Sequence, residues 1–388
     1  MSDARRNANA GTRRLRILHC PTDVGGNSTG LSRAERSLGA ASDVAVIQRS
    51  GLGYEVDIDL ALGEKSRIVR LAHRAAFLAR SLSKYDVFHF NFGQALLPQV
   101  RSLGVDLPLL RALGKRVYMT FQGCDARQTA FLREHCEISC CGRTRGEGLC
   151  RAEQDRDKRN AIAYAARHCH RLFCVNPDLL RFVPNAEFVP YASVDPRAIE
   201  PAPSSCSGRL TIAHAPTNRA VKGTDAILRA LASLRAKHDF NLLLVEGVPH
   251  GEAMSMYARA DLVIDQLRVG WYGALAVEAM ALAKPVISYV RESDLEFLPR
   301  AMADELPVIS ATKESIAHVV DDLLGLPHRL RALGERGRAY VERWHDPRMI
   351  AKRLLAIYQD PAEPFWKDER ATAPLDSEAR SLNTSIAN

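Results

Sequence analysis

The sequence predicts an α/β protein with two doubly wound parallel sheets, one in each of two domains. Its 388 residues are enough for two domains of ordinary size. Short apolar runs rich in Val, Ile and Phe alternate with longer helical patterns, which is typical of βαβ units. The Pro- and Ser-rich segment 193–209, "SVDPRAIEPAPSSCSGR", interrupts this alternation, which then resumes.

The first domain is expected over residues 15–195, after a disordered basic tail at 1–14. Its strands are apolar runs of five to seven residues, and its helices show amphipathic spacing. Strands are expected at 14–20, 42–48, 85–91, 115–121, 171–175 and 186–192, with helices near 28–40, 65–83, 95–113 and 151–168.

A linker over 196–208 leads to a second domain at 209–344. A helix at 345–360 is expected to cross back to the first domain, and the polar tail 361–388 to be disordered. Ligands of such sheets bind at the carboxyl ends of the strands, so a site is expected in a cleft between the domains. Strands are expected at 210–216, 240–247, 261–267, 285–290 and 306–311, with helices at 223–237, 251–259, 273–283, within 292–304, at 313–324 and over 328–358.

Composition and charge narrow the class of protein. No apolar run approaches the ~20 residues that span a bilayer, and the start lacks the apolar core of a signal peptide, so a cytoplasmic protein is expected. The net charge of +8 lies in the first half, where residues 1–195 hold 29 Lys and Arg against 20 Asp and Glu. This excess indicates either solubility alone or peripheral contact with an anionic surface such as the inner face of a membrane. Nucleic acid is not an expected partner.

The stretch "VGWYGALAVEAMALAKPVISYV" (269–290) places one acid, Glu278, in an Ala-rich helix behind two glycines. Gly270 and Gly273 let the backbone turn and approach a ligand. The free N–H groups at the start of the helix suit a phosphate, and Glu278 could accept hydrogen bonds from vicinal hydroxyls such as those of a ribose. The alternative is an ordinary acid near the positive end of a helix.

This stretch resembles the donor-site signature of retaining family-4 glycosyltransferases, which have the GT-B fold: two Rossmann-like domains facing a cleft. The family pattern is Glu-Gly-Phe-Gly, four residues, then Glu-Ala-Met-Ala. Here Gly270-Trp271-Tyr272-Gly273 and Glu278-Ala279-Met280-Ala281 occupy those positions, followed by "AKPVI". The resemblance implies that Glu278 holds the nucleotide ribose and that the amides near Gly273 and Ala274 face the diphosphate.

One position departs from the family pattern. The first Glu of the family, which contacts the donor sugar, is Gly270 here. Asp265 and Gln266, at the end of the preceding strand, are the candidates for a substitute polar group. We take Asp265 as the candidate catalytic residue on this side of the cleft.

The segment "LTIAHAPTNRAVKGTDAILRAL" (210–231) reads as strand, loop and helix. The resemblance implies that an Arg and a Lys in this loop neutralise the donor diphosphate. Lys222-Gly223 matches the family well, whereas Arg219 lies three residues before Lys222 and the usual spacing is five. Two cations at a cleft edge would stabilise a leaving diphosphate; the alternative is a pair of solvated loop cations.

Two further loops carry candidates in the first domain. Gly25-Gly26 follow the first strand without forming G-x-G-x-x-G, and the resemblance implies that this loop lies against the donor. Gln122 stands where the family often has a His near the reacting centre. The resemblance therefore implies that Gln122 lies near the reacting centre, but not that it performs the chemistry of the His. Asp125 is expected to cap the next helix, or else to face the acceptor.

A cluster of cysteines lies in "REHCEISCCGRTRGEGLC" (133–150). Reduced thiols are expected in a cytosolic chain. The spacing C-x3-C-C-x8-C is irregular for zinc, for which paired C-x2-C motifs are typical. Two interpretations stay open, a structural zinc site or unligated thiols. The candidate ligands are Cys136, Cys140, Cys141 and Cys150.

Together these features predict a glycosyltransferase that moves a sugar from a nucleotide-diphosphate-sugar donor to a hydroxyl of a glycan or lipid-linked acceptor. The resemblance implies retention, a role in polysaccharide or glycoconjugate biosynthesis, and no cofactor for catalysis. Two alternatives are a catalytically degenerate GT-B binding protein, which Gly270 and Gln122 favour, and a nucleotide-sugar epimerase with the same fold. A dehydrogenase is disfavoured because the glycine fingerprint is missing.

Overall fold

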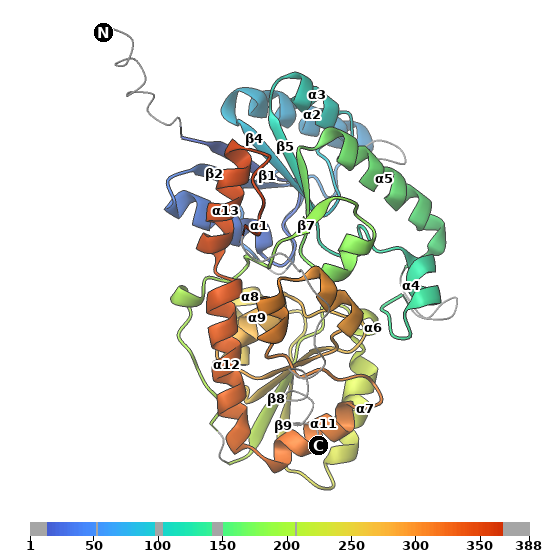
Figure 1. The fold of residues 1–388 in the computed structure, drawn as a ribbon, viewed down its shortest axis with the longest axis vertical. Coiled ribbons are helices and arrows are strands. Elements are labelled where there is room, and N and C mark those ends of the chain that lie inside the picture. Colours follow the sequence, from blue (N-terminus) through green and yellow to red (C-terminus); the bar gives the residue numbers. More distant parts are fainter. Residues whose placement is uncertain (1–13, 52, 98–103, 142–149, 206–207, 368–388) are drawn as a thin grey trace.

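The computed structural model describes residues 14–51, 53–97, 104–141, 150–205 and 208–367. They form two α/β domains placed one above the other along the long axis (Figure 1). The sequence predicts this division. Residues 1–13 and 368–388, which include most of the two tails predicted to be disordered, lie outside the described residues.

The first domain is built on a seven-stranded sheet in which every pair of neighbours is parallel, in the order β3-β2-β1-β4-β5-β6-β7. Its central strands are buried on both faces, so their sequences are continuous apolar runs. The edge strand β3 has two residues and is too short to give a sequence pattern. The strands are β1 Arg16–Cys20, β2 Ala41–Val46, β3 Ile58–Asp59, β4 Val87–Asn91, β5 Arg116–Phe121, β6 Arg171–Cys174 and β7 Ala186–Phe188.

Five α-helices of the first domain, α1 to α5, flank this sheet (Figure 1). Helix α4 lies beside the cysteine-rich segment and has no clear signal in the sequence. Its first turn is capped by Asp155, whose carboxylate accepts hydrogen bonds from the backbone N–H groups of Thr129 (2.9 Å) and Ala130 (2.8 Å). The helices are α1 Asn27–Ser37, α2 Arg67–Lys84, α3 Asp106–Ala112, α4 Thr129–His135 and α5 Asp155–His168, with 3-10 helices at Ala152–Gln154 and Pro177–Arg181.

The prediction that Asp125 caps the next helix is therefore wrong. Its carboxylate instead accepts hydrogen bonds from the backbone N–H groups of Gln122 and Gly123, the latter at 2.6 Å. Asp125 thus stabilises the turn that follows β5 by bonding to backbone groups of the same turn. Burial raises the pKa of Asp125 to about 6.

The second domain holds a four-stranded parallel sheet in the order β11-β10-β8-β9. The strand predicted over 306–311 is reduced to one parallel bridge between Ile287 and Ile309. The strands are β8 Leu210–His214, β9 Phe240–Leu244, β10 Leu262–Gln266 and β11 Val286–Ser288. The helices are α6 Arg219–Lys222, α7 Thr224–Leu234, α8 His250–Ala258, α9 Ala274–Ala281, α10 Arg300–Asp304, α11 Ile316–Gly325 and α12 His328–Trp344, with 3-10 helices at Pro196–Ala198 in the linker and at Glu292–Phe297.

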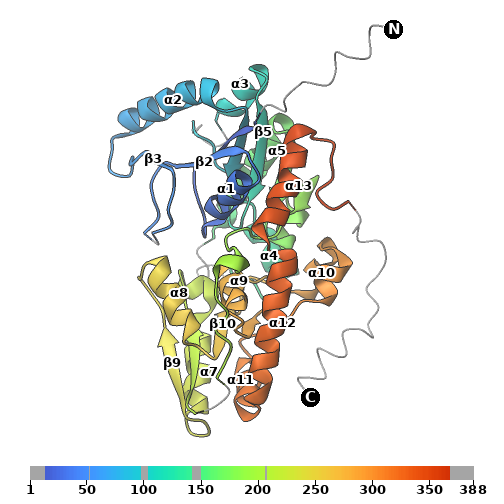
Figure 2. The same ribbon diagram turned by 90° about the vertical axis from the view of Figure 1, so that its left-hand side faces the viewer.

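Helix α13 (Pro347–Gln359) returns the chain to the first domain, where it packs beside α1 (Figure 2). The Tyr118 hydroxyl of β5 donates to the Ile357 carbonyl at 2.9 Å. The segment after α13 stays on this domain. Phe365 is fully buried, and the Trp366 indole N–H donates to the Phe188 carbonyl at 2.8 Å. The prediction of a disordered tail from residue 361 is thus wrong for residues 361–367.

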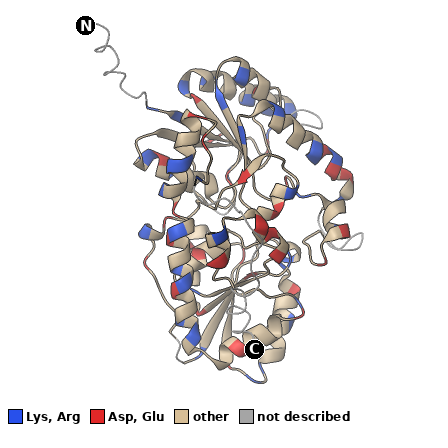
Figure 3. Ribbon diagram, viewed as in Figure 1, with Lys and Arg blue, Asp and Glu red and all other residues tan. Residues whose placement is uncertain are grey.

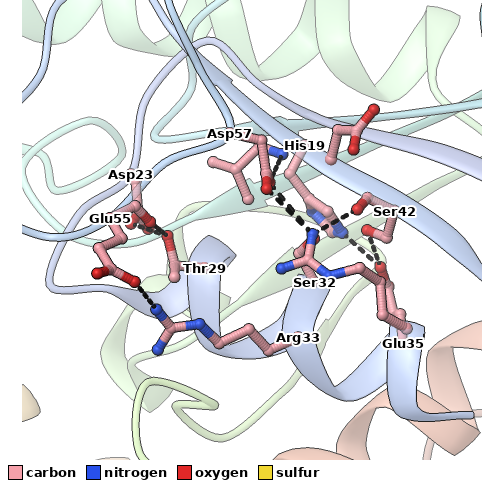
Figure 4. Close-up of polar contacts among 12 residues, drawn as sticks. His19, Asp23, Thr29, Ser32, Arg33, Glu35, Ser42, Glu55 and Asp57 are labelled. Carbon is pink, nitrogen blue, oxygen red and sulfur yellow. Dashed lines mark hydrogen bonds and ion pairs between the residues drawn. The ribbon is translucent and has the colours of Figure 1, made fainter.

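A buried polar cluster fixes α1 against β1 and β2 (Figure 4). His19 Nε2 lies 2.9 Å from Glu35 Oε2, and both side chains are fully buried. The Ser42 hydroxyl donates to the same carboxylate oxygen at 2.6 Å. At the start of the helix, Asp23 accepts from the Thr29 hydroxyl at 2.7 Å. These bonds hold the first turn of α1, and therefore the glycine loop before it, in one orientation.

A second buried histidine, His345, contacts residues of both domains. Its burial predicts that the free energy of unfolding depends on pH. His345 Nδ1 lies 2.9 Å from the Tyr191 carbonyl and Nε2 lies 2.8 Å from the Tyr272 hydroxyl. Burial lowers its pKa from 6.5 to about 4. Between these values the unfolded chain binds a proton that the folded chain does not, so stability is present above pH 6.5 and is lost as the pH falls.

We expect the free energy of unfolding to fall by about 2–3 kcal/mol more between pH 7 and 4.5 in the parent than in His345→Gln. Urea unfolding followed by tryptophan fluorescence at both pH values measures this difference. Equal pH dependence in the two proteins would show that His345 is not the titrating group.

Candidate functional site

The two domains meet at the glycine loop before α1. Gly25 and Gly26 have left-handed backbone angles, with φ of 61° and 70°. A Cβ atom built on Gly25 would lie 3.3 Å from Cβ of Ala274, the first residue of α9, and one on Gly26 would lie 2.7 Å from the Tyr54 ring. The structure thus brings this loop against the amino end of α9, at the position that the sequence analysis assigns to the donor.

A cation and a backbone amide converge on one carboxylate at this point. Lys222 Nζ lies 2.5 Å from Oδ1 of Asp265, and the Gly273 N–H donates to Oδ2 at 2.7 Å. Asp265 is fully buried. Gly223, with φ of 78°, ends α6 and turns Lys222 toward β10. The arrangement is a set of hydrogen-bond donors suited to an anionic oxygen, and in this structure the Asp265 carboxylate supplies that oxygen.

Glu278 lies one turn further along α9 and is 4% exposed. Its Oε1 lies 2.7 Å from Nε2 of His250, the first residue of α8. The Tyr54 ring, from the first domain, packs on the His250 ring with centroids 4.6 Å apart. Burial and the nearby Glu278 carboxylate raise the pKa of Tyr54. No sequence pattern indicates Tyr54 or His250, because both reach Glu278 through tertiary packing.

Gly270 occupies the position of the first Glu of the family, and its surroundings explain the glycine. Its φ is 92°, and a Cβ atom there would lie 2.7 Å from a guanidinium nitrogen of Arg291. Arg291 is held by Asp294 at 2.8 Å and by a bond from its own N–H to the Gly270 carbonyl. A carboxylate side chain therefore cannot stand at position 270 in this arrangement.

Gln266 is not the substitute for that carboxylate. Its amide nitrogen donates to the Trp271 carbonyl at 2.8 Å, and its amide oxygen accepts from the backbone N–H groups of Arg268 and Val269. The side chain is fully used in folding the loop between β10 and α9. This loop buries Trp271 and places Gly273 over Asp265.

The structure does not bring Arg219 to Lys222, which corrects the prediction that the two share one anion. The Arg219 guanidinium forms two hydrogen bonds, of 2.8 and 2.5 Å, with Glu246 just after β9. A bidentate carboxylate is a strong partner for Arg, and it draws the side chain away from Asp265. Arg268, which no motif indicates, lies beside α6, where its guanidinium donates to the Ala220 carbonyl at 3.1 Å.

Gln122 lies at the carboxyl end of β5 and is buried. Its amide nitrogen donates to Asn91 Oδ1 at 3.2 Å, and its amide oxygen has no partner among the described residues. A substrate hydroxyl or a water molecule could donate a hydrogen bond to this unpaired buried oxygen. Contact between Gln122 and a substrate stays a prediction.

A pocket of about 480 Å³ opens in the first domain beside the carboxyl ends of β1, β2 and β4. Arg70 and Arg74 of α2 form its basic side, and Arg74 donates to the Ala95 carbonyl at 3.0 Å. Figure 3 shows further Lys and Arg residues over this domain. The pocket is lined by Pro21, Thr22, Ile47, Gln48, Arg70, Arg74, Gly93, Gln94, Ala95 and Gly104.

The predicted zinc ligands are brought together only in part. Cys140, Cys141 and Cys150 lie close to one another, but Cys136 faces Arg291 and Asp294 instead. Within the described ranges, no group of three or more His, Cys, Asp and Glu side chains could hold a metal ion. The structure therefore does not bear out the predicted zinc site of Cys136, Cys140, Cys141 and Cys150.

Two curated proteins resemble part of this chain in sequence. No family model matches the chain. It is 27% identical over 250 residues to D-inositol 3-phosphate glycosyltransferase of Segniliparus rotundus, covering 55% of this chain and 54% of that protein. It is 24% identical over 216 residues to an MMP alpha-(1->4)-mannosyltransferase of Mycolicibacterium hassiacum, covering 48% and 50%. The chain thus spans about half the length of the curated relatives it matches.

Solved structures resemble the whole fold. Sucrose-phosphate synthase of Thermosynechococcus elongatus superimposes with a TM-score of 0.59 at 14% identity, covering 90% of this chain and 99% of that one. The HepE protein of Anabaena in complex with UDP-glucose gives 0.57 at 11% identity, covering 89% and 100%. Among the described helices, none is both long and apolar enough to cross a membrane. The predicted fold is confirmed: the chain has the two-domain GT-B fold, and the proteins that its sequence resembles are glycosyltransferases.

Proposed function

We propose that this protein is a retaining glycosyltransferase that moves a sugar from a nucleoside-diphosphate sugar to a hydroxyl group. The observation that carries the proposal is the convergence of the Lys222 ammonium and the Gly273 N–H on a single anionic position, with Glu278 one turn beyond. The names of the sequence relatives and the UDP-glucose bound to a structural neighbour support it.

In this proposal a diphosphate oxygen takes the position between Lys222 and the amides of Gly273 and Ala274. Glu278 accepts hydrogen bonds from the ribose. Because Glu278 is 4% exposed and Asp265 is fully buried, the donor enters when the two domains move apart. Asp265 acts as a positioning residue that aims Lys222, and its predicted contact with the donor sugar remains to be tested.

The transfer itself uses the same groups. As the bond from the sugar to the diphosphate breaks, negative charge grows on the leaving phosphate, and Lys222 with the start of α9 stabilises that charge. Retention follows if the acceptor hydroxyl attacks from the side of the leaving phosphate, which takes the hydroxyl proton. None of these steps uses a metal ion.

We place the acceptor in the first domain, at the pocket beside Arg70 and Arg74. Ile68 is 82% exposed on α2 next to Arg67, and Leu71 is half exposed. Apolar and cationic side chains together favour a peripheral contact with an anionic membrane, where a lipid-linked acceptor of a polysaccharide or glycoconjugate pathway would lie. Co-sedimentation with vesicles that contain anionic lipid tests this contact, and failure to pellet with them excludes it.

One observation favours a second function, a binding protein that has lost catalysis. Arg291 covers Gly270, so the position of the sugar-contacting carboxylate of the family holds a guanidinium instead. A panel of UDP-, GDP- and ADP-sugars separates the two functions. Slow hydrolysis of one donor, or transfer to an added glycan, supports the transferase. Binding of several diphosphates with neither reaction supports the binding protein.

Glu278→Gln tests the nucleotide site directly. The substitution keeps the size of the side chain but removes the charge that faces His250 and the proposed ribose. We expect it to weaken nucleoside-diphosphate binding by about 1–3 kcal/mol, the scale of a lost charge-assisted hydrogen bond. Isothermal titration calorimetry with UDP and GDP measures the change. Glu252→Gln, on the exposed face of α8, is the matched control and should bind like the parent. Unchanged affinity in Glu278→Gln would show that the site is misplaced.

A further inference from the structure

Arg291 places a guanidinium on the side of the nucleotide site where the donor sugar would lie. A nucleoside-diphosphate sugar is a chain of base, ribose, diphosphate and sugar, in that order. With the ribose at Glu278 inside α9 and the diphosphate at Lys222 and Gly273, the sugar extends toward the loop between β10 and α9. The guanidinium lies against that loop, because a Cβ atom on Gly270 would be 2.7 Å from one of its nitrogens.

Arg291 is held from both domains. Within the second domain, its Nη1 donates to Oδ2 of Asp294 at 2.8 Å, and its backbone N–H donates to the Gly270 carbonyl at 2.9 Å. From the first domain, the Ile138 carbonyl accepts a hydrogen bond from Nη2 at 2.9 Å. Separation of the domains, by which the donor enters, would break the bond to Ile138 and leave the bond to Asp294. The guanidinium would then stay in place with an N–H group free for the donor.

The charges around Arg291 leave room for one more anion when the domains are together. Asp294 is fully buried and accepts hydrogen bonds from Arg181 of the first domain at Oδ1 and from Arg291 at Oδ2, each at 2.8 Å. Two guanidinium groups therefore share one carboxylate. Glu296 also pairs with Arg181, but its side chain is 61% exposed, so solvent screens that pair.

Asp178, another acid that acts on Arg291, is engaged elsewhere. It accepts two hydrogen bonds from the Arg127 guanidinium, at 2.6 and 2.9 Å, and both side chains are buried. This bidentate pairing occupies both oxygens of the Asp178 carboxylate. A further anion beside Arg291 would therefore have to come from a ligand.

We propose that the donor is a nucleoside-diphosphate sugar with a carboxylate, a hexuronic acid, and that Arg291 binds this carboxylate. The inference rests on the proposed function and names the class of its donor. A planar guanidinium binds a carboxylate through two parallel N–H···O bonds, which the hydroxymethyl group of a neutral hexose cannot match. The carboxylate takes the N–H group that leaves Ile138. When the domains close again, Arg181 returns to Asp294 and adds a second cation.

Gly270 suits such a donor. A carboxylate side chain at position 270 would pair with Arg291 and repel an acidic sugar, whereas glycine leaves the guanidinium to the ligand. The φ of 92° at Gly270 also lies in the region that favours glycine. The position thus selects by charge as well as by space.

Binding of matched donor pairs to the full-length protein tests the proposal. UDP-glucose and UDP-glucuronic acid differ only at carbon 6 of the sugar, as do UDP-galactose and UDP-galacturonic acid, and GDP-mannose and GDP-mannuronic acid. Isothermal titration calorimetry at neutral pH should show, for at least one pair, that the uronic acid binds at least about tenfold more tightly than its neutral partner. Tenfold is the lower end of what a hydrogen bond between charged groups contributes.

Arg291→Gln should remove this preference, so that the two members of the pair bind with similar affinity. Arg291→Lys keeps the charge without the planar pair of donors and should retain part of the preference. Arg300→Gln, which removes a half-exposed arginine of α10, is the matched control and should prefer the uronic acid as the parent does. The preference of the parent needs no variant, so the proposal stays testable if Arg291→Gln fails to fold.

Titration with UDP and GDP separates this inference from the proposed function. If the protein binds a nucleoside diphosphate but binds each neutral sugar as well as its uronic acid, the inference is wrong and the proposed function stands. If no nucleotide binds, both are wrong. A preference for the uronic acid that survives in folded Arg291→Gln would also overturn the inference, because another residue would then hold the carboxylate.

Discussion

Replacement of Lys222 by Met should abolish nucleoside-diphosphate binding and lower the free energy of unfolding by about 3–5 kcal/mol. The cause is Asp265, whose fully buried carboxylate takes its charged hydrogen bond from Lys222. Without Lys222 the Gly273 N–H remains as a donor, with the Ser288 hydroxyl at 3.4 Å, and neither carries a charge. A buried carboxylate that has lost its cation is among the most destabilising local changes in a protein.

The double variant Lys222→Met/Asp265→Asn separates the two effects. The amide leaves no charge behind, so most of the lost stability should return, whereas nucleotide binding should stay lost because its cation is gone. Urea unfolding and calorimetric titration with UDP and GDP measure both quantities. Parent-like stability in Lys222→Met would show that Asp265 does not depend on Lys222. Restored nucleotide binding in the double variant would exclude Lys222 from the diphosphate site.

Among substitutions that add one methyl group to α1, Gly30→Ala should lower the free energy of unfolding most. Gly30 lies inside α1, where the helix passes against the segment that leads into the linker. A Cβ atom there would lie 2.0 Å from the Ala192 carbonyl oxygen. Both groups belong to the backbone, so neither can turn aside, and the Asn27 side chain already fixes Ala192 by accepting its N–H at 2.8 Å. We expect a loss of about 3 kcal/mol or more in the free energy of unfolding.

Gly251→Ala is the control for this prediction. Gly251 also lies in a helix, α8, but nothing lies within 4 Å of an added Cβ atom. There the substitution should raise the free energy of unfolding by up to about 1 kcal/mol through helix propensity alone. Urea unfolding of both variants gives the comparison. A neutral Gly30→Ala would mean that α1 and the linker can separate at low cost.

The sequence predicts the fold well because the relevant signals are local. Runs such as "DLVIDQL" are apolar along their length, since β10 is covered on both faces, and this distinguishes buried parallel strands from amphipathic helices. Lys222 and Glu278 are indicated by the resemblance to short family motifs, in which each residue sits at a fixed offset from a glycine turn or helix start. The structure places both at the domain boundary.

Partners that come from distant segments could not be predicted. Arg219 turns to Glu246, which lies 27 residues later just beyond another strand, and Glu278 meets His250 and Tyr54 through the packing of α8 and of the opposite domain. Because the residues in such contacts have no fixed spacing along the chain, a sequence pattern cannot indicate them. For the same reason the sequence does not indicate that the sulfur of Cys124, well before the cysteine-rich segment, lies 3.9 Å from that of Cys150.

The return of α13 to the first domain bears on how the chain folds during synthesis. Ile350, Leu354 and Phe365 share a hydrophobic core with residues of the first domain such as Ile17 and Val87. That core cannot close until the segment through residue 366 has emerged from the ribosome. The other core of the first domain draws its buried residues only from 18–183, so the face of the first sheet that α13 covers is buried last, after the second domain already has its whole sheet.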